Sequence, residues 1–347
     1  MDKYNDREVI KVVGIDLAKS VFHLHGVDMH GKVVMRRKLG RDKLTTLMSR
    51  LTPCLVGMEA CRGSHDWARK LMSMGHDVRL MSPQFVKPYV KSNKNDMVDA
   101  EAICEAVQRP NMRFVPIKGV EQQDIQSLHR ARSLAVSHRT ALVNQMRGLL
   151  LEYGMPVVKG VASLRKALPE ILEDADNGLT PMFRGLLSGL QDELHRLNER
   201  IAAYDMQIKC LSEQSDACRR LMTIPGVGPM TATALVAAVA DAKVFKSGRE
   251  MSAWLGLVPR QHSTGGKPKL LGISKRGDTY LRKLLIHGAR AALRFADRRQ
   301  DRRSRWVIEL ESRRGRNIAA VALANKTVRT AWVLLCRSEE YKAATAA

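Results

Sequence analysis

Four acidic residues in the first third of the chain have the type and spacing to hold divalent cations. Asp16 interrupts the apolar run VVGIDLA, and Glu59 ends the apolar segment LVGME. Asp96 and Asp99 lie three residues apart, a spacing that places both carboxylates on one face of a helix. Four carboxylates held together repel one another unless cations lie between them. Oxygen-only ligands suit Mg²⁺ or Mn²⁺, and two such ions would balance the four charges and support phosphodiester exchange.

Each acid also has an ordinary structural interpretation. Asp96 could be the N-cap of its helix and Asp99 a solvated residue of the first turn. This interpretation is weaker for Asp16 and Glu59, because each of them follows a buried apolar strand. We therefore take the four acids together as one candidate catalytic and metal-binding set.

Short apolar strands and helices alternate around these acids. The pattern predicts strands near 12–15, 21–27, 32–37, 54–58 and 76–80, with helices near 43–51, 65–74 and 96–109. An acid on the first strand, another on the fourth and an acidic pair on a helix is the arrangement of the RNase H-like (RuvC-like) nuclease fold. We expect an α/β catalytic domain over residues 1–115.

Residues 116–216 are expected to form a helical coiled-coil region. Apolar side chains repeat at alternating spacings of four and three, which is the seam of a coiled coil. The seam residues are Phe183, Leu187, Leu190, Leu194, Leu197, Ile201, Tyr204, Ile208 and Leu211. A preceding helix near 123–150 has a poorer seam, because Arg132 and Arg139 occupy companion positions. Heptads do not specify whose helix is packed, so an intramolecular hairpin and a dimer or tetramer interface both stay open.

Residues 217–347 are expected to form a mainly helical domain with a glycine-rich turn. The segment IPGVG precedes a predicted helix, which is the pattern of a helix-hairpin-helix. Gly226 and Gly228 would permit a tight turn, and the N–H groups of the next helix could face a DNA phosphate. A plain turn between two packed helices would need the glycines as well.

Positive charge is concentrated in this last region. Residues 260–316 hold 17 Lys+Arg against 5 Asp+Glu, within a chain of 347 residues and net charge +23. Such an excess favours a polyanionic partner, and nucleic acid is the first candidate. The predicted nucleic-acid contacts are Gly226, Gly228, Arg260, Lys267, Lys269, Lys275, Arg276 and Arg282.

The segment QHSTGGK supplies a hydroxyl group beside two glycines. Ser263 is a candidate nucleophile or phosphate ligand, because glycine allows the backbone to approach a phosphate closely. A serine in a glycine-rich loop is also a common turn residue.

Several protein classes are disfavoured. No apolar run approaches the roughly 18 to 20 residues of a membrane span, and the polar start MDKYNDREV is not that of a secretory signal, so we expect a cytoplasmic protein. The six cysteines lack the spacing of zinc or disulfide sites and are expected to be buried, reduced thiols. The chain has no phosphate-binding P-loop, which predicts chemistry without ATP.

The order of these motifs resembles the DEDD-type bacterial insertion-sequence transposases of the insertion-sequence 110 family, relatives of the Piv DNA invertases. The resemblance runs from Val12 to about Trp332 and includes VVGIDLAK, GMEACRGSH, KNDMVDAEAI, IPGVG, WLGLVPRQHSTGGK and GISKRGDTYLRKLLIHGARA. It implies a RuvC-like domain, a coiled coil and a C-terminal transposase domain. Donor and target DNA would be the partners, together with a guide RNA encoded by the element.

The same resemblance implies roles for individual residues. Asp16, Glu59, Asp96 and Asp99 would hold Mg²⁺, while Ser263 would attack a phosphodiester and form a covalent phosphoserine intermediate. Many relatives have glycine directly after this serine, whereas here Thr264 follows it. Thr264, and after it Ser274, are therefore rivals for the nucleophile.

Two other functions stay open. A hydrolytic RuvC-like junction-resolving nuclease would need only the four acids, and it would release cleaved ends free of protein. A non-enzymatic DNA- or RNA-binding architectural protein would need only the positive charge. Metal-dependent cutting that is lost in Asp16→Ala would exclude the architectural protein.

Overall fold

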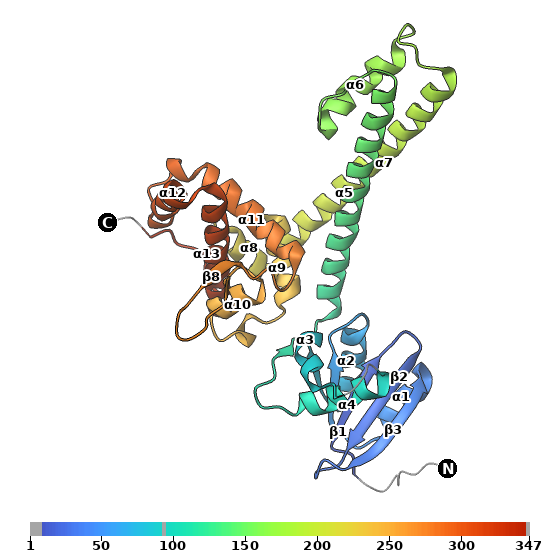
Figure 1. Cartoon of the computed structure of the whole chain (residues 1–347), viewed down its shortest axis with the longest axis vertical. Coiled ribbons are helices and arrows are strands. Elements are labelled where there is room, and N and C mark those ends of the chain that lie inside the picture. Colours follow the sequence, from blue (N-terminus) through green and yellow to red (C-terminus); the bar gives the residue numbers. More distant parts are fainter. Residues whose placement is uncertain (1–8, 92–94, 345–347) are drawn as a thin grey trace. The chain divides into compact units, whose positions relative to one another are not determined.

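The computed structural model describes residues 9–91 and 95–344, and the chain separates into two compact units, Met1–Gly119 and Val120–Ala347 (Figure 1). The first unit holds the predicted α/β sheet. The second unit contains both the long helices and the basic C-terminal helices. The finer division at 116–216 and 217–347 stays a proposal.

One mixed sheet forms the centre of the first unit. Its strand order is β3-β2-β1-β4-β5-β6, where β1 pairs antiparallel with β2 and parallel with β4, and β4 pairs parallel with β5. The strands are β1 (Val12–Leu17), β2 (Val21–Val27), β3 (Val33–Gly40), β4 (Leu55–Glu59), β5 (Asp77–Met81) and β6 (Phe114–Val115).

Helices cover both faces of this sheet. Side chains of α1 (Arg41–Arg50) and α2 (Ser64–Ser73) share a core with Ile15, Leu24 and Met58. On the other face, α4 (Asp96–Val107) packs with Val12, Val27 and Met81, next to α3 (Pro83–Val86) and the 3-10 helix η1 (Lys87–Tyr89). Since residues alternate along a strand, even-numbered positions of β1 face α4.

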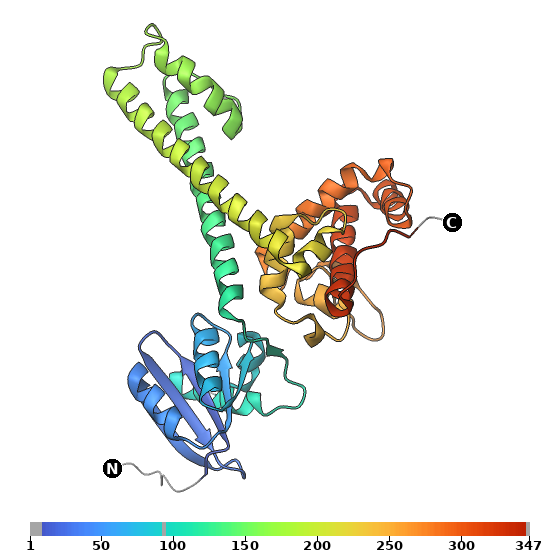
Figure 2. The same cartoon turned by 180° about the vertical axis from the view of Figure 1, so that it is seen from behind.

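The long helices of the second unit pack on one another within the chain. They are α5 (Val120–Glu152), α6 (Val161–Glu173) and α7 (Pro181–Gln214). Leu142 and Met146 of α5 share a core with Phe183, Leu187 and Leu194 of the heptad seam, and both views show α5 and α7 side by side (Figures 1 and 2).

Charged and polar pairs continue this helix contact. Arg132 forms an ion pair with Asp205, and Arg139 Nη1 donates to Asn198 Oδ1 over 3.1 Å. The arginines that weakened the predicted seam of α5 are thus bound to α7. Of the two interpretations of the heptads, the intramolecular hairpin describes this chain, and an interface with a second copy stays a proposal.

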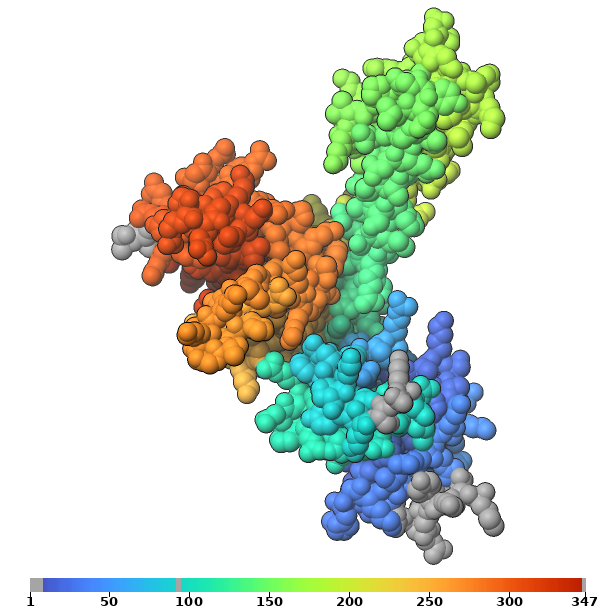
Figure 3. Space-filling model, viewed as in Figure 1, coloured from blue at the N-terminus to red at the C-terminus, as the bar shows by residue number. Residues whose placement is uncertain are grey.

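The remaining helices share one apolar core. They are α8 (Asp216–Met222), α9 (Pro229–Val239), η2 (Ala242–Val244), α10 (Gly248–Trp254), α11 (Thr279–Arg294), η3 (Ala296–Arg298), α12 (Arg302–Arg314) and α13 (Arg316–Arg337), with a two-stranded hairpin of β7 (Pro259–Gln261) and β8 (Leu270–Ile273). Figure 3 shows α11 to α13, in orange to red, as one closely packed body.

Two expectations need correction here. Among the described residues, α13 is long and apolar enough to cross a membrane by length and composition, although no such segment was expected. Its Ala320, Leu323 and Val328 are buried in the C-terminal core, as in the core helix of a globular domain. The cysteines are all free, but Cys61 and Cys210 are exposed and Cys336 is half-buried, whereas all six were expected to be buried.

Candidate active site and nucleic-acid interface

The strand register places two of the predicted acids side by side. Ile15 of β1 pairs with Met58 of β4, so Asp16 and Glu59 each follow a paired position at the same end of two parallel neighbours. Both residues lie two positions beyond a glycine that faces α4, and alternation turns both side chains toward that helix.

Two glycines allow α4 to approach the sheet closely. Gly14 and Gly57 are paired across β1 and β4. A Cβ atom added at Gly14 would lie 2.2 Å from the carbonyl oxygen of Ala100, and one added at Gly57 would lie 2.8 Å from Cβ of Val107. No side chain fits between strand and helix at these positions. The lack of a side chain at Gly14 and Gly57 therefore allows the N-terminal end of α4 to lie close to Asp16.

Three of the four predicted acids converge at this point. Carboxylate oxygens of Asp16, Asp96 and Asp99 all lie within 4.8 Å of one another, with Asp16 and Asp99 half-buried and Asp96 exposed. Helix α4 begins at Asp96, and its N-cap is Asn95, whose Oδ1 accepts from Met97 N over 3.0 Å. The alternative in which Asp96 caps the helix is therefore wrong. The helix presents the two aspartates three residues apart, as their spacing predicted.

Glu59 lies near the three aspartates, but it is not part of the set of described acids whose carboxylate oxygens lie within 4.8 Å of one another. Glu59 is half-buried. Burial first, and then the charges of Glu59 and Asp16, raise the pKa of the Cys61 thiol. Both carboxylates are thus close enough to act on one neighbouring thiol.

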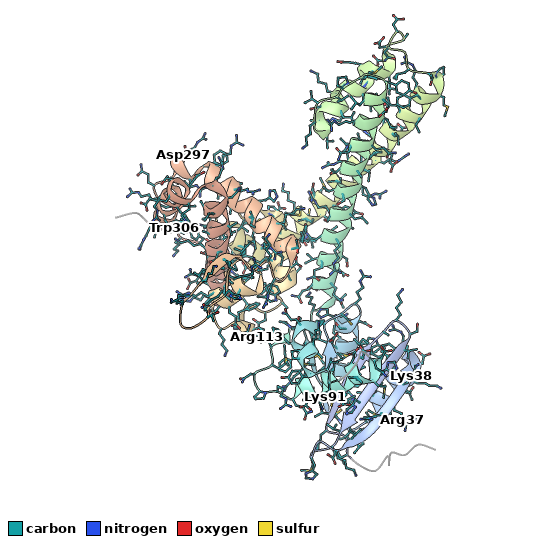
Figure 4. All side chains as sticks on the ribbon, viewed as in Figure 1. Arg37, Lys38, Lys91, Arg113, Asp297 and Trp306 are labelled. Carbon is teal, nitrogen blue, oxygen red and sulfur yellow. The ribbon has the colours of Figure 1, made fainter. Side chains whose placement is uncertain are left out.

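Glu101, another acid of α4, is paired with basic side chains instead of joining the three aspartates. Glu101 contacts Arg36 Nη2 at 3.5 Å and Lys91 Nζ at 3.4 Å, and Figure 4 labels Lys91. Two basic side chains already balance the charge of Glu101. It therefore has a structural explanation that does not involve a cation.

A histidine that the sequence patterns did not single out lies beside the acids. His23 of β2 pairs with Asp16 of β1, and its Nδ1 lies 3.6 Å from Asp96 Oδ2. The side chain is buried, and Nδ1 has no hydrogen-bond partner among the described atoms. The alternation in VFHLHGV, combined with the hairpin between β1 and β2, was a signal that could have placed His23 opposite Asp16.

Ser263 lies in the second unit, in the loop of the hairpin formed by β7 and β8. Residues 264–267 form a turn in which Lys267 N donates to Thr264 O over 3.2 Å, and Gly265 and Gly266 both have positive φ, 58° and 75°. Two successive positive φ values are the geometry of a type I′ turn, which glycine adopts readily. Ser263 is exposed next to this turn, and its Oγ accepts a 2.8 Å hydrogen bond from Gln261 Nε2.

The base of this hairpin is tied to the helices by backbone contacts. A Cβ atom at Gly256 would lie 2.1 Å from Arg276 O, and one at Gly277 would lie 2.0 Å from Trp254 O. Arg282, predicted to contact nucleic acid, is only 8% exposed and donates to Leu255 O at 3.1 Å and Arg276 O at 2.9 Å. Its guanidinium holds the loop in place, and we leave Arg282 out of the proposed nucleic-acid surface.

The remaining predicted basic contacts are on the surface. Within the described part of the chain none of these five side chains forms an ion pair, so their charges face solvent. They are Arg260, Lys267, Lys269, Lys275 and Arg276. The hairpin of β7 and β8 and the segment after it thus carry exposed positive charge.

The predicted helix-hairpin-helix segment forms a tight turn between α8 and α9. Gly226 has a φ of 88°, and a Cβ atom there would lie 2.4 Å from Gly288 O of α11. Gly226 is thus required for packing, as in a plain turn. Gly228 is exposed and precedes α9, and a Cβ atom added there would meet no atom within 4 Å. The phosphate contact predicted for Gly226 and Gly228 stays a prediction.

Comparison with known proteins identifies the class as transposase. A family model described as "Transposase" matches residues 13–155, and one described as "Transposase IS116/IS110/IS902 family" matches residues 218–304. The first match contains the acids, and the second contains the hairpin with Ser263.

Individual relatives match over nearly the whole chain. A probable family 20 transposase of Pseudomonas aeruginosa is 51% identical, covering 95% of this chain and 98% of its own. The transposase for insertion sequence element IS1111A of Coxiella burnetii is 48% identical over 96% and 92%, and that for IS1328 of Yersinia enterocolitica is 42% identical over 94% and 96%. The chain belongs to the IS110/IS116/IS902 family of transposases, as its motifs predicted.

Proposed function

We propose that this transposase cuts and rejoins the DNA strands of a mobile element by using a divalent-cation site in the first unit and a serine nucleophile in the second. The convergence of Asp16, Asp96 and Asp99 within 4.8 Å is the observation that carries the proposal. The strand order with a helix-borne acidic pair supports an RNase H-like, RuvC-like fold for the first unit.

The donor set fits Mg²⁺, with Mn²⁺ as a second candidate. Clustered carboxylate oxygens are the ligands that these hard cations take. Asp16, Asp96 and Asp99 would hold the cations, and Glu59, at the adjacent strand end, would complete a two-ion site. When bound, such ions stabilise negative charge on the attacking and leaving oxygens of phosphodiester exchange.

Ser263 is the proposed nucleophile. Its hydroxyl is exposed, and the hydrogen bond from Gln261 leaves its proton available for transfer. Attack on phosphorus would form a bond from serine oxygen to phosphorus and release a DNA hydroxyl, so the energy of the phosphodiester bond is kept for rejoining. Thr264 is part of the turn, and Ser274 Oγ accepts a hydrogen bond from Arg276 N over 3.5 Å. Both residues stay rival candidates for the nucleophile.

The exposed basic residues around the hairpin support DNA as the partner. The net charge of +23 favours a polyanionic partner, and we propose an element-encoded guide RNA beside the DNA. Sequencing nucleic acid that co-purifies with the protein tests the RNA directly. If the protein binds a guide RNA, we expect one transcript from the DNA that flanks the gene. A mixture of unrelated cellular RNAs would contradict the proposal.

A covalent-adduct assay tests the mechanism. With labelled element-end DNA and Mg²⁺, we expect a protein–DNA adduct that is lost in both Asp16→Asn and Ser263→Ala. Thr264→Ala is the matched control and should retain the adduct. Adduct formation by Ser263→Ala at the normal rate would reject the nucleophile, and cleaved ends free of protein would select a hydrolytic nuclease.

A further inference from the structure

His23 is a buried side chain next to the acidic cluster, with a nitrogen atom that has no hydrogen-bond partner among the described residues. It is 7% exposed, and its Nδ1 makes no hydrogen bond within the described part of the chain. An unsatisfied buried polar atom costs about 1–3 kcal/mol, so such atoms call for an explanation. This nitrogen lies at the protein's candidate cation site, next to Asp96.

We propose that His23 Nδ1 is a nitrogen ligand of the cation site, sharing a cation with Asp96 and making the site prefer Mn²⁺ over Mg²⁺. This inference rests on the proposed cation site. It adds a donor from β2 to the acids supplied by β1, β4 and α4.

The distances are consistent with a shared cation. Two donors that lie about 2.1 Å from one ion are separated by roughly 3 Å at right angles and by about 4 Å when opposite. The 3.6 Å from His23 Nδ1 to Asp96 Oδ2 lies between these limits and is long for a hydrogen bond. His23 is outside the three-acid set that shares 4.8 Å spacings, so Asp96 is the residue that joins the histidine to the cluster.

The preference for Mn²⁺ follows from ligand chemistry. Mg²⁺ takes oxygen ligands, whereas imidazole nitrogen binds transition metals, whose affinities at mixed nitrogen and oxygen sites rise from Mn²⁺ onward. Removing one nitrogen donor should therefore weaken Mn²⁺ binding more than Mg²⁺ binding.

The same strand offers a matched control. His25 lies two positions along β2 on the same face, is 3% exposed and also has an unpartnered Nδ1. Its neighbours are different, because the charges nearest His25 belong to Glu101, Arg36 and Lys91. Replacing His25 thus perturbs the same buried strand without removing the proposed ligand.

The test is pulsed electron paramagnetic resonance on the full-length protein with Mn²⁺, supported by Mn²⁺ titration and Mg²⁺ competition. We expect a directly coordinated ¹⁴N coupling that changes to a ¹⁵N coupling when histidine is ¹⁵N-labelled. His23→Asn should abolish the coupling and weaken Mn²⁺ binding about tenfold, with Mg²⁺ affinity reduced less, while His25→Asn keeps both.

The outcomes separate the two proposals. Tight Mn²⁺ binding without nitrogen coupling in the wild-type protein would overturn the role of His23 and leave the carboxylate site intact. Failure of the wild type to bind Mn²⁺, with no difference from Asp16→Asn, would overturn the cation site as well. The spectrum of the wild-type protein decides the ligand question even if His23→Asn does not fold.

Discussion

The close contact between Gly14 and α4 predicts a large effect from one added methyl group. In Gly14→Ala the new Cβ would lie 2.2 Å from Ala100 O, and ordinary contact begins at 3.4 Å, so the helix backbone must retreat by about 1.2 Å. Overpacking of this kind costs about 1–3 kcal/mol, partly offset by about 0.4–1 kcal/mol from a less flexible unfolded chain.

The same displacement would separate Asp96 and Asp99 from Asp16. A misplacement of about 1 Å can reduce catalysis on the order of 100-fold, so strand cleavage should fall more than stability. The assays are urea unfolding, Mn²⁺ titration and adduct formation. Gly40→Ala is the control, because Gly40 is in the same sheet, has a φ of −78°, and a Cβ atom added there would meet no atom nearer than 3.9 Å.

If Gly14→Ala binds Mn²⁺ and forms the adduct as well as Gly40→Ala does, then the approach of α4 to the sheet does not determine the geometry of the acids.

Other regions give further expectations. Gly288→Ala would place Cβ 2.0 Å from Gly226 O and should lower the free energy of unfolding by about 1–3 kcal/mol in urea, whereas Gly228→Ala, with open space around it, should change it far less. Burial first, and then the charge of a nearby arginine, lower the pKa of His129 to about 4, below its unfolded value, so its contribution to stability is complete above pH 6.5 and is lost as the pH falls toward 4. Thermal unfolding at pH 7 and 5 should show a smaller loss for His129→Gln than for the wild type, and equal losses would contradict this assignment. Lys267→Ala combined with Lys269→Ala should reduce the slope of log affinity against log salt by up to about 1.8 in a DNA-binding titration, and an unchanged slope would place DNA elsewhere.

Local patterns were sufficient to predict most of the first unit. Alternating apolar residues marked the strands within a few positions, and the spacing of Asp96 and Asp99 correctly placed both on one helix. The convergence of three acids could be predicted because they lie at strand ends and at the start of a helix, and periodicity locates such positions well.

Other parts of the candidate site depend on contacts that periodicity does not encode. The role of His23 requires the register between β1 and β2, and the role of Gly14 requires knowledge of which helix crosses it. Arg282 lies in a basic sequence that suggests exposure, yet backbone carbonyls satisfy its buried guanidinium. The paired glycines after Thr264 indicated a glycine-rich loop, and their positive φ values form the turn of a hairpin.

In the β7–β8 hairpin, the residues that fix the base are distinct from the exposed residues of the tip. Backbone contacts at Gly256 and Gly277 secure its base, while every residue from 260 to 270 is exposed and contributes nothing to the core. Substitutions at such positions usually change the free energy of unfolding by less than about 0.5 kcal/mol. A substitution at the tip should therefore leave the enzyme folded, so a loss of activity in such a variant reports on the function of the replaced side chain rather than on unfolding.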